Sequence, residues 1–381
     1  MSRPVVVVGC GPAGLAVTAC LVERGVRPVL LDRADQVGSA WRNHYDRLHL
    51  HTTRDQSHLP GRPFPRHWPQ YVPRAKVVEY LDAYAEAFGL EPRLNTAVQR
   101  VEPGEGGEWR VRLGDGADLR ASHVVMATGF NRVPYEPAWP GMEGFGGRIR
   151  HSAGYKNGAD LAGRTVLVVG MGNTGAEIAL DVLEHGGRPV ISVRGPVNIV
   201  PRDILGRPTA KTALLLGRLP ARVADPIGSL LRRLTVGDLT PWGIETPHVP
   251  PLAQLREEGS TPVVDVGTVA RIKEGAIRVV GAIDRFSPGA VELVGGESLR
   301  CEEVVLATGY RSAMEEIVPV SERILNRHGH PPGPWWDGGL NDLYFAGFDG
   351  YSTGGLLRSI RLEAPRIAQR IVDRLERPPG R

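Results

Sequence analysis

A glycine-rich loop that occurs twice is the feature that most constrains how this chain of 381 residues can fold. One copy spans 9–14 and reads GCGPAG, and the other spans 170–175 and reads GMGNTG. Each copy follows an apolar run typical of a buried parallel strand, opens a helical pattern and leads to a second strand. A single GxGxxG sequence is weak evidence, but the same context in duplicate predicts two βαβ dinucleotide-binding units.

The three glycines of such a loop have separate tasks. The first permits a tight turn, the second lets the backbone approach a pyrophosphate, and the third lets the helix pack on the strand. The N–H groups and the partial positive charge of the helix N-terminus then favour phosphate. We therefore predict that one dinucleotide is held by Gly9, Gly11, Pro12, Ala13 and Gly14. The residues predicted to hold the other are Gly170, Gly172, Asn173, Thr174 and Gly175.

The polar residue after the second strand of each unit indicates which ligand is bound. Asp32 ends the first unit, where a carboxylate can accept hydrogen bonds from ribose hydroxyls and repels a 2′-phosphate, which favours FAD. Arg194 ends the second unit, where a guanidinium can pair with a 2′-phosphate, which favours NADPH over NADH. Asp32 as a helix-cap or surface acid, and Arg194 as a solvated side chain, are the alternatives.

An Ala-Thr-Gly sequence ends a predicted strand at two places, 127–129 and 307–309. These two segments imply that the chain crosses from one nucleotide-binding domain to the other and back. We expect an α/β fold of two Rossmann-like dinucleotide-binding domains with three-layer sheets. The FAD domain is predicted to comprise 1–156 and 301–381, and the NADPH domain is predicted to be inserted as 157–300.

Charge and cysteine content exclude several other classes of protein. The net charge is only +4 and the charges are dispersed, so no nucleic-acid partner is expected. Three cysteines without a CxxC pair argue against a disulfide framework, a zinc site and a redox-active dithiol. Because no apolar run is long enough to span a bilayer, we expect a cytoplasmic protein without a transmembrane segment. The oligomeric state is not fixed by the sequence, and a homodimer stays open.

The segment between the two loops carries a resemblance to a known family. Residues 145–155 read FGGRIRHSAGY and match FxGxxxHxxxY, the identifying motif of class B flavin-dependent monooxygenases. Motif by motif, the chain resembles this class over nearly its whole length. Within the class it is most similar to the plant YUCCA-type indole-3-pyruvate monooxygenases. That likeness is carried by 45–51, 71–73, 155–158, 193–197, 236–239, 262–268, 347–348 and 354–357.

The resemblance implies an enzyme that uses FAD, NADPH and O₂. NADPH would reduce FAD, O₂ would then form a flavin C4a-hydroperoxide, and bound NADP⁺ would shield it from water. The implied substrate is a small aryl 2-oxo acid that loses CO₂. Oxygenation of a nitrogen or sulfur atom, Baeyer–Villiger oxidation, and an NADPH oxidase that releases H₂O₂ stay open as alternatives. A non-catalytic nucleotide sensor is disfavoured because both loops are intact.

The resemblance also implies which residues lie near the flavin. We predict that His51 makes a polar contact there, at a position where animal-type members carry asparagine; a loop histidine bonded to the backbone is the alternative. His151 is expected to order the linker between domains rather than to transfer a proton. The further cofactor contacts predicted are Arg33, Trp41, Leu48, His49, Thr128, Gly129, Ala307, Thr308, Gly309, Gly347 and Phe348.

Two other segments bear on the substrate. Residues 349–353 read DGYST and differ from the basic segment expected in the plant enzymes, at a place predicted to lie beside the isoalloxazine. The stretch 210–234 mixes leucines with arginines and is predicted to form a packed pair of helices. A lid over the substrate tunnel and a membrane-surface helix are the alternatives for it.

Overall fold

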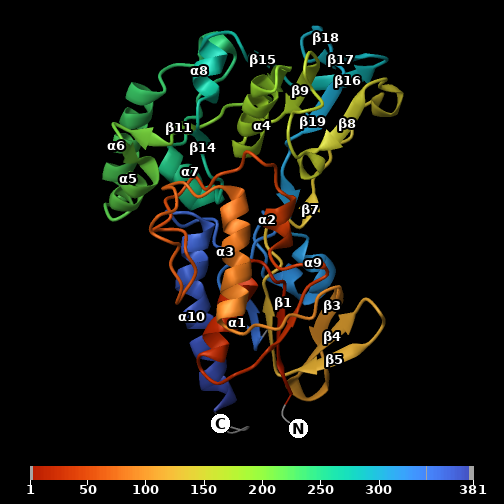
Figure 1. Ribbon diagram of the computed structural model, residues 1–381, viewed down its shortest axis with the longest axis vertical. Coiled ribbons are helices and arrows are strands. Elements are labelled where there is room, and N and C mark those ends of the chain that lie inside the picture. The colour runs from red at the N-terminus through yellow and green to blue at the C-terminus, as the bar shows by residue number, and fades with distance from the viewer. Residues whose placement is uncertain (1–2, 340, 377–381) are drawn as a thin grey trace.

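The computed structural model describes residues 3–339 and 341–376 of the chain. It has two halves, each built on a parallel sheet, and the half that contains both ends of the chain is drawn in red, orange and blue (Figure 1). The first sheet has the order β2-β1-β6-β21. Its strands are β2 (Val29–Leu31), β1 (Val5–Val8), β6 (His123–Met126) and β21 (Leu343–Phe345).

The four valines of β1 are buried because the first sheet is covered on both faces. Val5 and Val7 pack toward the helices α1 (Pro12–Val22), α3 (Arg74–Ala87) and α10 (Leu356–Leu375). Val6 and Val8 pack toward an antiparallel sheet of β3 (Val98–Pro103), β4 (Trp109–Leu113) and β5 (Asp118–Ala121). The result is three layers: helices, the parallel sheet and a small antiparallel sheet.

The second sheet repeats this arrangement in the other half of the molecule. Its order is β15-β10-β9-β19-β8. The strands are β15 (Arg278–Val280), β10 (Arg188–Ser192), β9 (Thr165–Val169), β19 (Glu303–Leu306) and β8 (Arg148–His151). Helix α4 (Asn173–Glu184) packs on one face, through the core cluster that includes Val166 and Val168. The other face is covered by β16 (Ile283–Ser287), β17 (Ala290–Leu293) and β18 (Ser298–Arg300).

These two three-layer units confirm the predicted fold class of two Rossmann-like domains. The boundaries predicted for the insertion, 157 and 300, leave out two strands of the second sheet. Strand β8 precedes residue 157, and β19, which pairs with both β8 and β9, follows residue 300. The second sheet therefore reaches beyond the predicted insertion at both ends, because the crossing segments begin and end with strands that join it.

The two predicted crossings lie side by side. After Thr128-Gly129 the chain enters β7 (Val133–Pro134), and after Thr308-Gly309 it enters β20 (Tyr310–Arg311). These two short strands pair antiparallel, and the Thr308 hydroxyl donates to the carbonyl of Tyr135. The two segments in which the chain crosses between the halves thus form a two-stranded antiparallel ribbon.

The remaining elements lie mostly at the edge of the second half (Figure 1). They are α2 (Ser39–Asn43), β11 (Ile199–Pro201), β12 (Asp203–Ile204), β13 (Arg207–Pro208), α5 (Thr209–Leu216), α6 (Ala221–Thr235), α7 (Pro251–Glu258), β14 (Val263–Asp265), α8 (Thr268–Lys273) and α9 (Met314–Ile317), with short 3₁₀ turns at 105–107, 142–144, 152–154, 240–242 and 319–323. The stretch 210–234 is thus two helices, α5 and α6, and both also line the main cavity described below. Their outward leucines, such as Leu230 and Leu234, are exposed. Among the described residues, no helix is long and apolar enough to cross a membrane.

Candidate active site

In the first phosphate loop, only one of the three glycines has room for the Cβ atom of a larger residue. A Cβ atom on Gly9, where φ is +111°, would lie 2.5 Å from the carbonyl oxygen of Ala127, and one on Gly14 would lie 1.8 Å from the carbonyl oxygen of Gly9. A Cβ on Gly11 would meet no protein atom within 4 Å. Contacts within the protein therefore account for glycine at positions 9 and 14. At position 11, glycine would instead allow a ligand to approach the backbone closely.

The second loop repeats these relations position by position. A Cβ on Gly170, where φ is +107°, would lie 2.8 Å from the carbonyl oxygen of Ala307, and one on Gly175 would lie 1.9 Å from that of Gly170. Gly172 again faces open space. Neither α1 nor α4 has a side-chain cap at its N-terminus, so the first N–H groups of both helices are left for phosphate oxygens. Both loops fit the pyrophosphate of a dinucleotide.

Asp32 lies beside the first phosphate loop, and Arg194 lies near the second. The Asp32 carboxylate accepts the backbone N–H groups of Cys10, at 2.5 Å, and of Ala34, at 2.9 Å, which fixes it beside the first loop. Arg194 is exposed just after β10 and lines a cavity of about 620 Å³ that also borders the second phosphate loop. The chemistry of both side chains fits the ribose of FAD and the 2′-phosphate of NADPH, respectively.

The cavity beside the second loop, called here the nucleotide groove, contains five of the predicted residues: Gly170, Gly172, Arg194, Ala307 and Thr308. Sequence reasoning missed Tyr135, Trp139 and Ser192, which also line it. Trp139 comes from the linker after β7, and no motif marks it.

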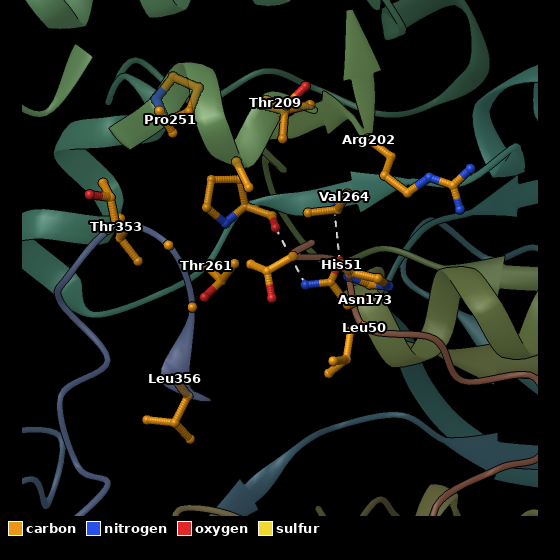
Figure 2. Close-up of a pocket in the computed structure, with 18 of the residues that line it drawn as sticks. Leu50, His51, Asn173, Arg202, Thr209, Pro251, Thr261, Val264, Thr353 and Leu356 are labelled. Carbon is orange, nitrogen blue, oxygen red and sulfur yellow. Dashed lines mark hydrogen bonds between the residues drawn. The ribbon is translucent and has the colours of Figure 1, made fainter. Parts of the chain in front are cut away.

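The larger cavity, called here the main cavity, has a volume of about 630 Å³ and lies where the two halves meet. Figure 2 shows residues from distant segments around it, such as His51, Thr209, Pro251 and Thr353. It shares Thr261 with the nucleotide groove, so the two spaces adjoin. Most of its wall surface is apolar, and polar groups such as His51, Arg202 and Asp349 are set within it, as expected of a site for a small organic ligand.

Some of the residues predicted to contact a cofactor line the main cavity, and others lie away from it. Trp41, Leu48, His49 and His51 line the main cavity, as do Asn173 and Thr174 from the start of α4. Asn173 also accepts the N–H of Val264 at 2.7 Å, which ties the second loop to β14 (Figure 2). The segment 349–353 lines the same cavity through Asp349, Gly350, Ser352 and Thr353.

The other predicted residues lie away from the main cavity. Phe348 is buried in the core against Phe130 and Phe345, and Arg33 is exposed on the surface. The N–H of Gly347 donates to Glu363 at 3.2 Å. Thr128 has a buried hydroxyl oxygen without a hydrogen-bond partner in the described part of the chain, and Gly129 and Gly309 have positive φ values at the two crossings. The unpartnered Thr128 hydroxyl is a group that a bound cofactor would satisfy.

The histidines near the site have different environments. His44 lines the main cavity, and burial, helped by the cations of Lys156 and Arg74, lowers its pKa to about 4, so its ring is neutral at neutral pH. His51 is bonded to a side chain instead of the backbone, since its Nε2 atom lies 2.7 Å from Oε1 of Glu177. Sequence reasoning missed Glu177. The feature that could have indicated it is the presence of carboxylates within the otherwise apolar stretch 175–183.

The residues of the FxGxxxHxxxY motif connect β8 to the crossing at 307–309 and to α4. Nδ1 of His151 accepts the N–H of Ala153 at 3.1 Å, so Nε2 carries the hydrogen that is donated to the carbonyl of Gly309 at 3.0 Å. Burial lowers the pKa of His151, consistent with a neutral ring. The fully buried Tyr155 donates its hydroxyl to Asp181 on α4 at 2.6 Å. These contacts favour the linker role expected of His151.

Comparison with known proteins gives a consistent result over most of the chain. The model of the flavin-binding monooxygenase-like family matches residues 2–318. The indole-3-pyruvate monooxygenase YUCCA1 of Oryza sativa subsp. japonica is 39% identical over 349 residues, which cover 90% of this chain and 86% of the relative. The indole-3-pyruvate monooxygenase YUCCA6 of Arabidopsis thaliana is 38% identical over 377 residues, covering 96% of this chain and 89% of the relative.

The solved structures agree on the fold. A flavin-containing monooxygenase from Stenotrophomonas maltophilia superimposes with a TM-score of 0.73 at 24% identity, covering 98% of this chain and 100% of that one. The paired three-layer units described above are therefore a known arrangement.

Proposed function

Because the chain belongs to the flavin-binding monooxygenase-like family, we propose that it oxygenates a small aryl 2-oxo acid in the main cavity, with indole-3-pyruvate as the first substrate to test. The predicted enzyme class and cofactors are confirmed by the family: the protein is a flavin-dependent monooxygenase that uses FAD, NADPH and O₂. The identity of the substrate is what we propose in addition.

The likeness to the plant enzymes is the observation that carries the proposed substrate. It holds at 39% identity over 90% of the chain, and it includes the stretch 195–260 from which much of the main-cavity wall is built. Leu216, Leu231, Leu252 and Leu255 give that wall a surface suited to an aromatic ring. The proposed reaction consumes one NADPH and one O₂, places one oxygen atom in a new carboxylate, and releases CO₂ and water.

The protein's own contribution is binding, orientation and exclusion of water. Bound FAD would supply an oxygen-reactive ring, and bound NADPH would supply the hydride that reduces it. We assign the pyrophosphate contacts to Gly11 and Gly172, and the contacts that select the ribose ends to Asp32 and Arg194. Helices α5 and α6 line the main cavity and shield part of it from solvent.

One set of assays tests this proposal. The FAD-loaded protein is given NADPH and O₂ with indole-3-pyruvate, phenylpyruvate, a cyclic ketone or a tertiary amine, and NADPH consumed, product and H₂O₂ are measured together. We expect the aryl 2-oxo acids to convert most of the consumed NADPH into product and CO₂. Product from the ketone or the amine alone would replace the proposed substrate class, and H₂O₂ equal to the NADPH consumed with every compound would indicate an oxidase.

A further inference from the structure

A buried carboxylate connects the second phosphate loop to the histidine beside the main cavity. Glu177 follows that loop on the second turn of α4, and only 4% of its side chain is exposed. Its Oε1 atom lies 2.7 Å from Nε2 of His51 and 3.3 Å from the hydroxyl of Tyr45. Both partners belong to the segment between α2 and α3 that borders the first half. One oxygen atom thus joins two parts of the site that are more than 100 residues apart in the chain.

The direction of these hydrogen bonds determines the state of the histidine ring. Tyr45 is 2% exposed, and burial together with the nearby Glu177 raises the pKa of its hydroxyl well above the usual value, so the hydroxyl donates. A carboxylate oxygen accepts, so Nε2 of His51 also carries its hydrogen toward Glu177. Nδ1 of His51 makes no hydrogen bond with any residue in 3–339 or 341–376, which leaves it for a group in the cavity.

Resting on the function proposed above, we propose that Glu177 is a positioning residue that holds His51 in one orientation and one tautomer toward the ligand in the main cavity. Because Glu177 is on α4, this orientation depends on the helix that begins at the second phosphate loop. The arrangement follows the general rule that the bond made by one ring nitrogen of a histidine sets what the other nitrogen can do.

The same helix supplies a matched comparison one turn later. Asp181 is also a buried carboxylate, with 6% of its side chain exposed, and it accepts the hydroxyl of Tyr155 at 2.6 Å. It lines neither the main cavity nor the nucleotide groove. Asp181 thus stabilises the contact between α4 and the linker. Unlike Glu177, it does not bond a histidine that lines the main cavity. Replacing Asp181 therefore measures the effect of losing a buried carboxylate on α4 alone.

The first test reads the tautomer of His51 directly by ¹⁵N NMR of the histidine rings. The His51 signals are assigned by their loss in His51→Ala, and spectra are recorded with and without FAD. We expect hydrogen on Nε2 in the wild type and in Glu177→Gln, whose amide oxygen still accepts, and a mixture of tautomers in Glu177→Ala. Asp181→Asn should leave the His51 signals unchanged. An unchanged His51 spectrum in Glu177→Ala would overturn the proposal.

The second test is a double-mutant cycle on the partition between H₂O₂ and product. His51→Ala and Glu177→Ala should each raise the ratio of H₂O₂ to product by about tenfold, the low end for loss of a charged hydrogen bond. If Glu177 acts through His51, the double variant should be no worse than either single variant. Ratios that multiply would contradict the proposal, as would a Glu177→Ala enzyme that loses thermal stability but keeps the wild-type ratio. If the wild type forms no product from any substrate, the proposed function fails, while the NMR test still decides on Glu177.

Discussion

Replacing the second glycine of each phosphate loop by alanine should abolish one cofactor site at a time without disturbing the fold. Gly11 has φ −76° and ψ −176°, which alanine adopts without strain, and its new Cβ would meet no protein atom within 4 Å. In the protein without cofactor, Gly11→Ala should thus be neutral or stabilise by up to about 1 kcal/mol through the unfolded state. The methyl group would instead occupy the space that a pyrophosphate needs.

The expected loss of affinity follows from the hydrogen bonds that the methyl group prevents. A hydrogen bond to a charged group contributes about 1.5–3 kcal/mol, so holding the phosphate away from two N–H groups costs about 3 kcal/mol or more. That free energy corresponds to a dissociation constant for FAD weakened by about 150-fold or more. The purified variant should be colourless, and titration of the flavin-free protein with FAD, followed by fluorescence, gives the constant.

The matched variants make the result specific to each site. Gly172→Ala should keep the yellow colour and the FAD affinity, but raise the KM for NADPH by a similar factor, since Gly172 has the same open surroundings. Gly14→Ala should instead destabilise the fold, because its Cβ would lie 1.8 Å from the carbonyl oxygen of Gly9. A Gly11→Ala protein that is folded and binds FAD with wild-type affinity would refute the assignment of the first loop.

Three further changes test other parts of the structure. Arg194→Ala should raise the KM for NADPH much more than that for NADH, since only NADPH carries the 2′-phosphate; equal effects would refute the contact. Burial raises the pKa of Glu363 from about 4.5 to about 7, so the folded protein binds more protons than the unfolded chain in that range and stability falls as pH rises. Urea unfolding should therefore show Glu363→Gln to be more stable than the wild type at pH 8 by up to about 3 kcal/mol, with no such gain at pH 4.5, and an equal difference at both pH values would contradict this. Tyr155→Phe leaves Asp181 without the tyrosine donor and should lower the free energy of unfolding by about 1–3 kcal/mol, with an unchanged FAD affinity; a neutral effect would show that this bond does not stabilise the packing of the linker on α4.

Local sequence patterns were sufficient to locate the elements that hold the phosphates. The buried strands predicted before the two loops are β1 and β9, and the helices predicted after them begin at Pro12 and Asn173. These elements are set by apolar runs and by glycines whose roles depend on near neighbours in the chain. The predicted bounds of the inserted domain leave out β8 and β19, because the sheet that a strand joins depends on pairing with strands far away in the chain.

The side chains of the site were harder to predict than its backbone. The sequence indicated that His51 is near the ligand, and the structure places it on the main cavity, but its partner Glu177 lies on the other half of the molecule. Phe348 was predicted from a motif and belongs to the core instead. Four of the leucines that wall the main cavity come from 195–260, and the sequence alone left open whether 210–234 forms a packed helix pair, a lid or a membrane-surface helix.

Part of the contact between α4 and the segment 44–73 is polar, in addition to the apolar packing of Tyr45 and Leu48 against the core of the second half. Along one side of α4, Glu177 and Glu184 meet His51 and Arg47 of that segment, and Asp181 between them meets Tyr155, which follows β8. Hydrogen bonds and ion pairs are directional, whereas apolar packing tolerates sliding, so this row of contacts fixes the helix in both rotation and position. Since the N-terminus of the same helix follows the second phosphate loop, the residues that would hold the NADPH pyrophosphate and the residue that we propose to position His51 are on one rigid element. Hydride transfer from bound NADPH to bound FAD would need the two sites held in a fixed relation, and we expect this row of contacts and the packing of Tyr45 and Leu48 to provide it.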